Sequence, residues 1–136
     1  MRVDIRPAKK EDLSGLNMNE QGLRSCRAYL NASVFAWTGL VDGQIVCIWG
    51  LVPPTLLSDS AYLWLITTPV VEDHKFAFVR HSQIILNGML DSFPLIVGHV
   101  LADQPQSKKW LKWLGVKFMP AEGRLIPFEL RRASCG

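Results

Sequence analysis

Polar and apolar residues alternate at the beginning of the chain and then recur at helical spacing. The alternation runs from Arg2 to Arg6 and predicts a half-buried strand, which Pro7 ends. A first helix is expected over 9–18. A second is expected over 20–31, where apolar residues return every three or four positions. The chain therefore opens with one strand followed by two helices.

Apolar residues dominate the middle of the chain, where three strands are predicted. Val34–Val41 and Gln44–Val52 flank Asp42-Gly43, which is a strong signal for a two-residue hairpin turn. Ala61–Thr67 is a nearly continuous apolar run, which is typical of a central strand buried on both faces.

Helical and strand patterns alternate in the second half of the chain. We expect a long helix over His74–Ser92, a strand over Leu95–Leu101, a short basic helix over Ser107–Leu114 capped by Gly115, and two strands over Val116–Met119 and Leu125–Arg131. The predicted order is β-α-α-β-β-β-α-β-α-β-β. This order indicates an α/β (α+β) fold with a mixed, mostly antiparallel sheet and helices on both faces. No linker divides the chain, so residues 1–136 are expected to form a single domain.

The composition is that of a globular protein, with 49% hydrophobic residues among 136. A net charge of +3 permits an anionic ligand but gives no nucleic-acid signature. The three cysteines, Cys26, Cys47 and Cys135, form no Cys-x-x-Cys pair, so neither a metal site nor a disulfide is expected. They are predicted to fill apolar space in a reducing cytoplasm. The chain shows no signal peptide and no apolar run long enough to span a bilayer, so a soluble intracellular protein is expected.

Two segments, taken with the order of the elements, resemble the GNAT fold of acetyl-CoA-dependent N-acyltransferases. They are IRPAKKEDL (Ile5–Leu13), which is similar to the first strand and helix start of that family, and QPQSKKWLKWLGVKF (Gln104–Phe118), which is similar to its late motif. A narrower resemblance lies in TTPVVEDHKFAFVRH (Thr67–His81), followed by a strand and SKKWLKWLGVKF. This combination looks like the small GNAT-like proteins of tailed bacteriophages, which include an internal virion protein of short-tailed phages.

The resemblance implies that acetyl-CoA is the cofactor and that an amine is the acceptor. In the family, the fourth strand holds the pantetheine arm through its backbone, and a glycine-rich loop before the third helix holds the pyrophosphate. Carried over to this sequence, the implied cofactor-binding residues are Leu65, Ile66 and Thr67 in the strand, His74, Lys75 and Phe76 at the helix start, and Gln104 and Ser107 in the late motif.

The sequence departs from the family pattern at the pyrophosphate loop and at the catalytic positions. The loop contains no glycine, and Glu72 and Asp73 place two negative charges in it. Asp73 is predicted to cap a helix that begins at His74, which would use the N–H groups that a phosphate needs. Leu111 stands where many members have a Tyr that protonates the departing thiolate.

The remaining candidate for catalysis is His99, which lies in the predicted strand Leu95–Leu101 and could act as a base at neutral pH. A lone His in an apolar strand is more often structural. Tyr62 and Glu129 are further candidates for acid or base.

The basic helix offers another interpretation, because Lys108, Lys109 and Lys112 lie beside Trp110 and Trp113. Aromatic and basic residues together are typical of a surface for nucleic acid or for the adenine and phosphates of a cofactor. Helical spacing favours instead that both tryptophans face the sheet while the lysines are solvated, so nucleic acid is not expected as a partner.

Three functions are therefore open for a protein of the host cytoplasm or of the virion. One is an acyl-CoA N-acyltransferase of phage origin, active or inactive. A second is a noncatalytic virion or host-interaction protein that retains the fold and contacts other phage or host proteins. A third, a nucleic-acid binder, would need the lysines of the basic helix to form a coherent patch with lysines or arginines from elsewhere in the chain.

Overall fold

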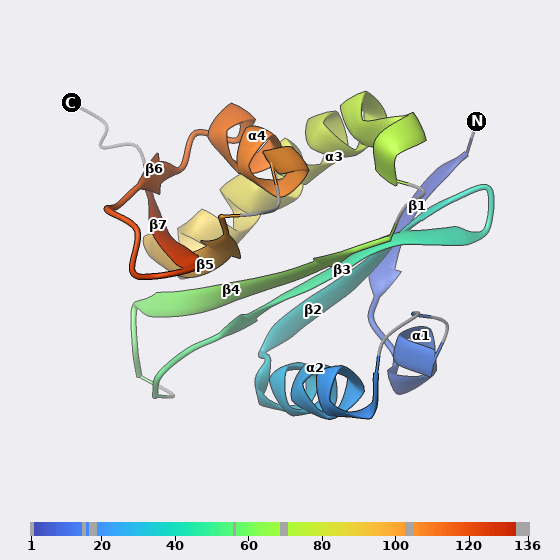
Figure 1. Cartoon of the computed structure of the whole chain (residues 1–136), viewed down its shortest axis with the longest axis horizontal. Coiled ribbons are helices and arrows are strands. Elements are labelled where there is room, and N and C mark those ends of the chain that lie inside the picture. The colour runs from blue at the N-terminus through green and yellow to red at the C-terminus, as the bar shows by residue number, and fades with distance from the viewer. Residues whose placement is uncertain are drawn as a thin grey trace. The chain divides into compact units, whose positions relative to one another are not determined.

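A computed structural model describes residues 2–14, 16, 19–55, 57–68, 71–102 and 105–132. Of residues 71–73, 75–79, 105–107 and 110 it describes the backbone alone. The elements are β1 (Val3–Pro7), α1 (Lys10–Ser14), α2 (Glu20–Ala32), β2 (Phe35–Val41), β3 (Gln44–Val52), β4 (Ser60–Thr67), α3 (Val71–Ser92), β5 (Leu95–Leu101), α4 (Pro105–Trp113), β6 (Lys117–Phe118) and β7 (Leu125–Arg131). Figure 1 shows them in the predicted order.

The strands form a seven-stranded sheet in the order β1-β2-β3-β4-β5-β7-β6. Among the described pairings, only that of β4 with β5 is parallel. The predicted fold class, a mixed and mostly antiparallel α/β fold, is confirmed. The bounds of β3, β5 and β7 are those predicted from the apolar pattern.

The chain forms two compact units, and β4 and α3 each run through both. The first unit comprises Met1–Val52 and Leu63–Phe78, and the second comprises Pro53–Tyr62 and Val79–Gly136. A single domain remains a prediction.

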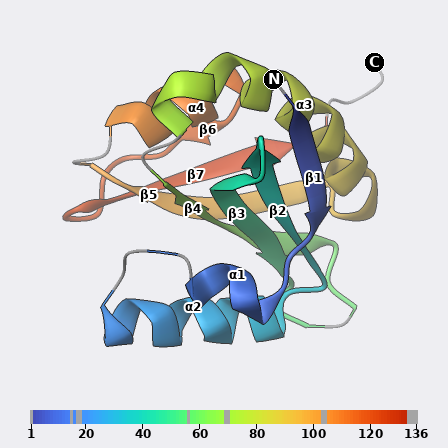
Figure 2. The same cartoon turned by 90° about the vertical axis from the view of Figure 1, so that its right-hand side faces the viewer.

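The first unit is built on the antiparallel strands β1, β2 and β3. The hairpin between β2 and β3 turns at Asp42 and Gly43, whose φ angles of 49° and 82° are those of the predicted two-residue turn. Figure 2 shows α1 and α2 side by side on one side of these strands. Cys26 of α2 and Cys47 of β3 are buried, as predicted for apolar filler.

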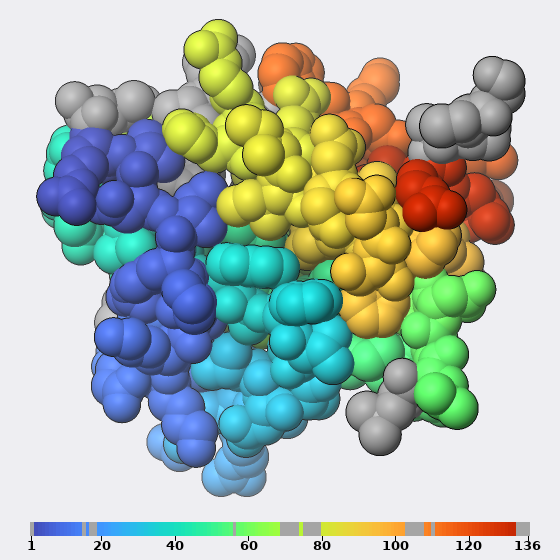
Figure 3. Space-filling view, turned by 180° about the vertical axis from the view of Figure 1, so that it is seen from behind, coloured from blue at the N-terminus to red at the C-terminus, as the bar shows by residue number. Residues whose placement is uncertain are grey.

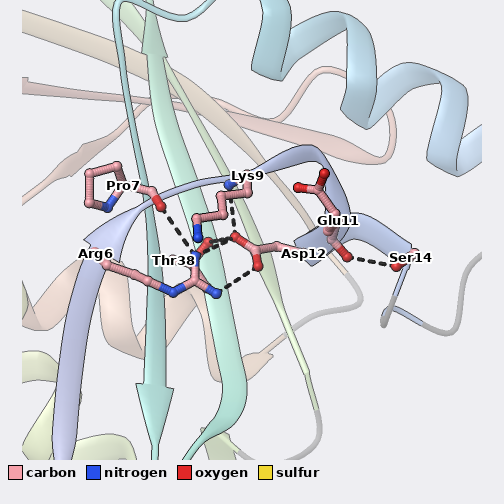
Figure 4. Close-up of polar contacts among 7 residues, drawn as sticks. All are labelled: Arg6, Pro7, Lys9, Glu11, Asp12, Ser14 and Thr38. Carbon is pink, nitrogen blue, oxygen red and sulfur yellow. Dashed lines mark hydrogen bonds and ion pairs between the residues drawn. The ribbon is translucent and has the colours of Figure 1, made fainter.

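A buried carboxylate connects α1 to β1 and β2 (Figure 4). Asp12 is 5% exposed, and its two oxygens accept hydrogen bonds of 2.7 and 2.9 Å from the guanidinium of Arg6. The backbone N–H of Lys9 (2.8 Å) and the hydroxyl of Thr38 (2.7 Å) donate to the same carboxylate. Burial by itself raises the pKa of Asp12, but the hydrogen bonds from Arg6, Lys9 and Thr38 and the charge of Arg6 outweigh it and lower the pKa to about 2.

A second close contact joins α2, β3 and β4 within the first unit. The indole N–H of Trp64 donates to Ser33 Oγ (2.7 Å), and the Ser33 hydroxyl donates to the carbonyl of Tyr29 (2.7 Å). Gly50 lies next to these two hydrogen bonds, and a Cβ atom at this position would come within 2.7 Å of Trp64 Nε1. Only glycine fits there.

In the second unit, β5 pairs in parallel with β4 and antiparallel with β7. α4 and the later part of α3 lie on one side of β5 and β7 (Figure 1). Leu86, Met89 and Leu90 of α3 and Leu111 of α4 are buried. The predicted cap at the end of α4 is confirmed, because Gly115 has a φ of 96°.

The outer side of α3 lies at the surface, in yellow in Figure 3. His81 is exposed there, and Ile84 is 71% exposed.

The predicted start of the long helix is wrong. The helix begins at Val71, three residues before the expected His74, so Asp73 lies inside the first turn and not before it. Acidic residues are favoured in the first turn of a helix as well as at its cap. Glu72 and Asp73 are therefore compatible with a helix that begins at Val71. His74 then interrupts the helix, with φ and ψ of −132° and 19°.

The predicted orientation of the basic helix is wrong for Trp113. This residue is 58% exposed, whereas Leu111 is 3% exposed and faces the core. The side chain of Trp110 lies outside the described part of the chain.

Candidate active site

His99 and Tyr62 form a side-chain pair on neighbouring strands of the second unit. Tyr62 of β4 is opposite Val97 of β5, and His99 follows Val97 by two residues, so its side chain leaves the same face of the strand. Tyr62 Oη and His99 Nδ1 lie 3.4 Å apart, and the two ring centroids lie 5.8 Å apart. A distance of 3.4 Å is long for a hydrogen bond, so the contact orients the imidazole loosely.

Glu129 of β7 lies on the same face of this sheet. Antiparallel pairing sets Glu129 opposite Val97, and residues directly opposite one another point to the same side. Glu129 Oε1 forms an ion pair of 3.3 Å with Arg131 Nε, and Lys117 of β6 pairs with Glu129 across the next ladder. The three acid–base candidates of the sequence therefore share one face of the second unit.

The arrangement can move a proton between His99 and a ligand. His99 is exposed, and Nδ1 is the ring nitrogen that faces Tyr62, so Nε2 is the nitrogen left for a ligand. When Nδ1–H donates to the Tyr62 oxygen, Nε2 carries the lone pair and can accept a proton. The opposite tautomer leaves a proton on Nε2, which can then be donated.

The other predicted site residues lie mostly in the first unit. Leu65, Ile66 and Thr67 are half-buried residues at the end of β4. Just beyond them, Thr68 anchors the strand end to β3, with its N–H donating to the carbonyl of Val46 (2.8 Å) and its hydroxyl to that of Ile45 (2.8 Å).

At the start of α3, His74 is half-buried at the break in the helix. Lys75 and Phe76 follow it on the helical backbone, and their side chains lie outside the described part of the chain.

The late motif is described only in part. Gln104 lies outside the described residues, and Ser107 is described by its backbone within α4. Leu111, which the sequence resemblance aligns with a Tyr, is buried in the core of the second unit. Leucine has no proton to donate, so this position cannot supply the acid.

Among the described residues, no three His, Cys, Asp or Glu side chains gather closely enough to hold a metal ion. Within the same part of the chain, the helices are too short or too polar to cross a bilayer.

Comparison with known proteins links the chain to N-acetyltransferases through structure alone. No family model and no curated protein sequence matches it. An IAA acetyltransferase from Bacillus cereus matches with a TM-score of 0.69 at 10% identity, covering 96% of this chain and 99% of that one. A ribosomal-protein alanine acetyltransferase from Vibrio fischeri matches with a TM-score of 0.68 at 11% identity, covering 96% and 93%.

A third structure is a chimera of the spermidine N-acetyltransferase SpeG from Vibrio cholerae and hSSAT. Its TM-score is 0.64 at 13% identity, covering 97% of this chain and 96% of that one. Coverage of nearly the whole of each chain means that the likeness extends over the complete fold. The chain therefore has the GNAT fold of these N-acetyltransferases.

Proposed function

We propose that the protein is an acyl-CoA N-acyltransferase that transfers an acetyl group to an amine. The observation that carries this proposal is the Tyr62–His99 pair, with Glu129 on the same face, in a chain whose fold matches acetyltransferases over nearly its full length. A fold alone does not define a reaction, whereas a positioned acid–base pair supplies part of the required chemistry.

In the proposed reaction, acetyl-CoA supplies the acetyl group as a thioester. His99 Nε2 accepts the proton that the acceptor amine loses. Tyr62 is a positioning residue, because its oxygen faces Nδ1 and leaves Nε2 as the ring nitrogen that meets the amine. Since Leu111 is buried and has no proton to donate, the departing thiolate takes its proton from another donor.

The residues proposed to hold acetyl-CoA are those named by the family resemblance. Backbone groups of Leu65, Ile66 and Thr67 would hold the pantetheine arm, and His74, Lys75, Phe76, Gln104 and Ser107 would contact the remainder. The beginning of α3 fits an anion only in part. A helix start offers free N–H groups, and Lys75 adds a cation, but the turn also contains two acidic residues and a break at His74.

Calorimetric titration with acetyl-CoA tests the cofactor proposal directly. We expect micromolar binding to the unaltered protein and its loss in Lys75→Glu. Lys10→Glu, which makes the same charge change at an exposed position of α1, is the control and should bind normally. The absence of heat and of thermal stabilisation at millimolar acetyl-CoA would overturn the proposal.

Acetyl transfer is measured as release of free CoA with a panel of amines that includes spermidine, the substrate named for a structural neighbour. His99→Gln should lower turnover by roughly 10²- to 10⁴-fold while the affinity for acetyl-CoA is unchanged. Tyr62→Phe should lower turnover by less than His99→Gln does, because the imidazole keeps its proton-accepting nitrogen and loses only a positioning contact. His81→Gln alters an exposed His of α3 and should have no effect. Equal activity of His99→Gln and the unaltered protein would exclude His99 as the base.

A noncatalytic role is the second candidate, and two observations favour it. Leu111 is buried where the family has its acid, and the start of α3 carries Glu72 and Asp73 in one turn. In this alternative the protein is a phage virion or host-interaction component that acts in the host cytoplasm or the particle. This second role would be supported if the protein failed to bind acetyl-CoA and was found in purified virions.

A further inference from the structure

The exposed side of α4 has an unusual composition. Trp113, the last residue of the helix, is 58% exposed, and Lys109 and Lys112 beside it are exposed as well. Lys108 is half-buried. The helix Pro105–Trp113 contains no acidic residue. Within this helix, no acidic side chain offsets the positive charge of the three lysines.

The spacing places these residues on one side of the helix. Lys109 and Trp113 are four residues apart, as are Lys108 and Lys112, so each pair lies one turn apart on the same stripe. With about 100° per residue, the two stripes are adjacent. Leu111 lies opposite the stripe of Lys109 and Trp113 but only about 60° from Lys108, which is half-buried. The result is a continuous surface of three lysines and one indole ring, which we call the α4 surface.

The net positive charge of the chain belongs to the unit that contains this surface. The second unit has eight Lys and Arg against five Asp and Glu, whereas the first unit has seven of each; together these make the 15 basic and 12 acidic residues of the chain. The second unit therefore attracts anions, and the first has no net charge at neutral pH.

We propose that the α4 surface binds single-stranded nucleic acid, with a base stacked on Trp113 and phosphates beside Lys109 and Lys112. An exposed indole offers a stacking face to any unpaired base, and nearby ammonium groups neutralise the backbone. In a duplex the base faces are already stacked and cannot reach the ring. Nucleic acid was not expected as a partner because both tryptophans were predicted to face the sheet. That prediction does not hold for Trp113, which is exposed.

Fluorescence anisotropy with a labelled oligothymidylate about 12 nucleotides long tests the proposal. The logarithm of the binding constant should fall with the logarithm of the salt concentration, with a slope of about −1.4 for the two lysine contacts. Lys109→Gln and Lys112→Gln should each make the slope shallower by about 0.7. Trp113→Ala should weaken binding about 5- to 150-fold at unchanged slope, while Trp113→Phe keeps most of the affinity.

Lys10→Gln on α1 removes the same charge from the first unit and is the matched control. The proposal is wrong if no binding is seen at about 50 mM salt, if Lys10→Gln changes the slope as much as Lys109→Gln does, or if Trp113→Ala binds normally. It is also wrong if a duplex of the same length binds as tightly. If acetyl-CoA displaces the oligonucleotide and Trp113→Ala loses acetyl-CoA binding, the α4 surface belongs to the cofactor and not to nucleic acid.

Discussion

Replacing Asp12 by Asn tests whether the buried carboxylate stabilises the first unit through its charge. Asn has nearly the same shape and keeps one acceptor oxygen for Thr38 and Lys9. Its amide nitrogen, however, is a donor, and it cannot pair with the guanidinium of Arg6 as the second carboxylate oxygen does. The change therefore removes the charged contact while leaving the packing nearly intact.

The pKa of Asp12 gives the size of the effect. The pKa falls from 3.8 to about 2 on folding. Because one pKa unit corresponds to 1.36 kcal/mol, the charged form of Asp12 contributes about 2 kcal/mol to the free energy of unfolding. Because the folded pKa is the lower one, this contribution is complete above about pH 5 and is lost as the pH falls toward 2. Arg6, whose side chain is 35% exposed, can turn to water in the variant, which keeps the loss below that of a fully buried broken pair.

Urea unfolding followed by tryptophan fluorescence measures the difference. Trp37, Trp49 and Trp64 lie in the first unit and report on it. Asp12→Asn should be about 2 kcal/mol less stable than the unaltered protein near pH 6, and the gap should close as the pH approaches 2. Asp91→Asn, an exposed change on α3, should show no such gap. A gap of equal size near pH 6 and near pH 2.5 would refute the charge-based reasoning.

Two substitutions and one labelling experiment test the buried residues further. Gly50→Ala should destabilise the protein by about 1–3 kcal/mol and alter the fluorescence of Trp64, because the added Cβ would lie 2.7 Å from Trp64 Nε1; a stable variant with an unchanged spectrum would contradict this contact. Leu111→Ala should cost about 2–5 kcal/mol in urea unfolding, since the residue is buried, and Trp113→Ala on the same helix should cost far less. Cys47 is fully buried and burial raises its pKa to about 12, so an aromatic disulfide reagent near pH 8 should label it only in urea; peptide mapping that finds Cys47 labelled in the folded protein would show that the strand opens.

Local sequence patterns determined the elements and their order. Strand alternation, helical spacing and the turn residues Asp42-Gly43 and Gly115 act over a few residues, so they predict β3, β5 and β7 to the residue. The same patterns also supported the resemblance to the GNAT fold, because that resemblance rests on the order of the elements. His99, Tyr62 and Glu129 were recognisable one by one as groups that can exchange protons.

Tertiary structure alone decided which of these residues meet. His99 and Tyr62 are 37 residues apart in the chain, and only the strand register brings them together and places Glu129 on their face. The contact of Asp12 with Thr38 likewise depends on where β2 lies against α1. Trp113 and Leu111 are both apolar, so periodicity could not tell which one faces the core. That choice belongs to the packing of α4 in the second unit, because burial depends on neighbours that are distant in sequence.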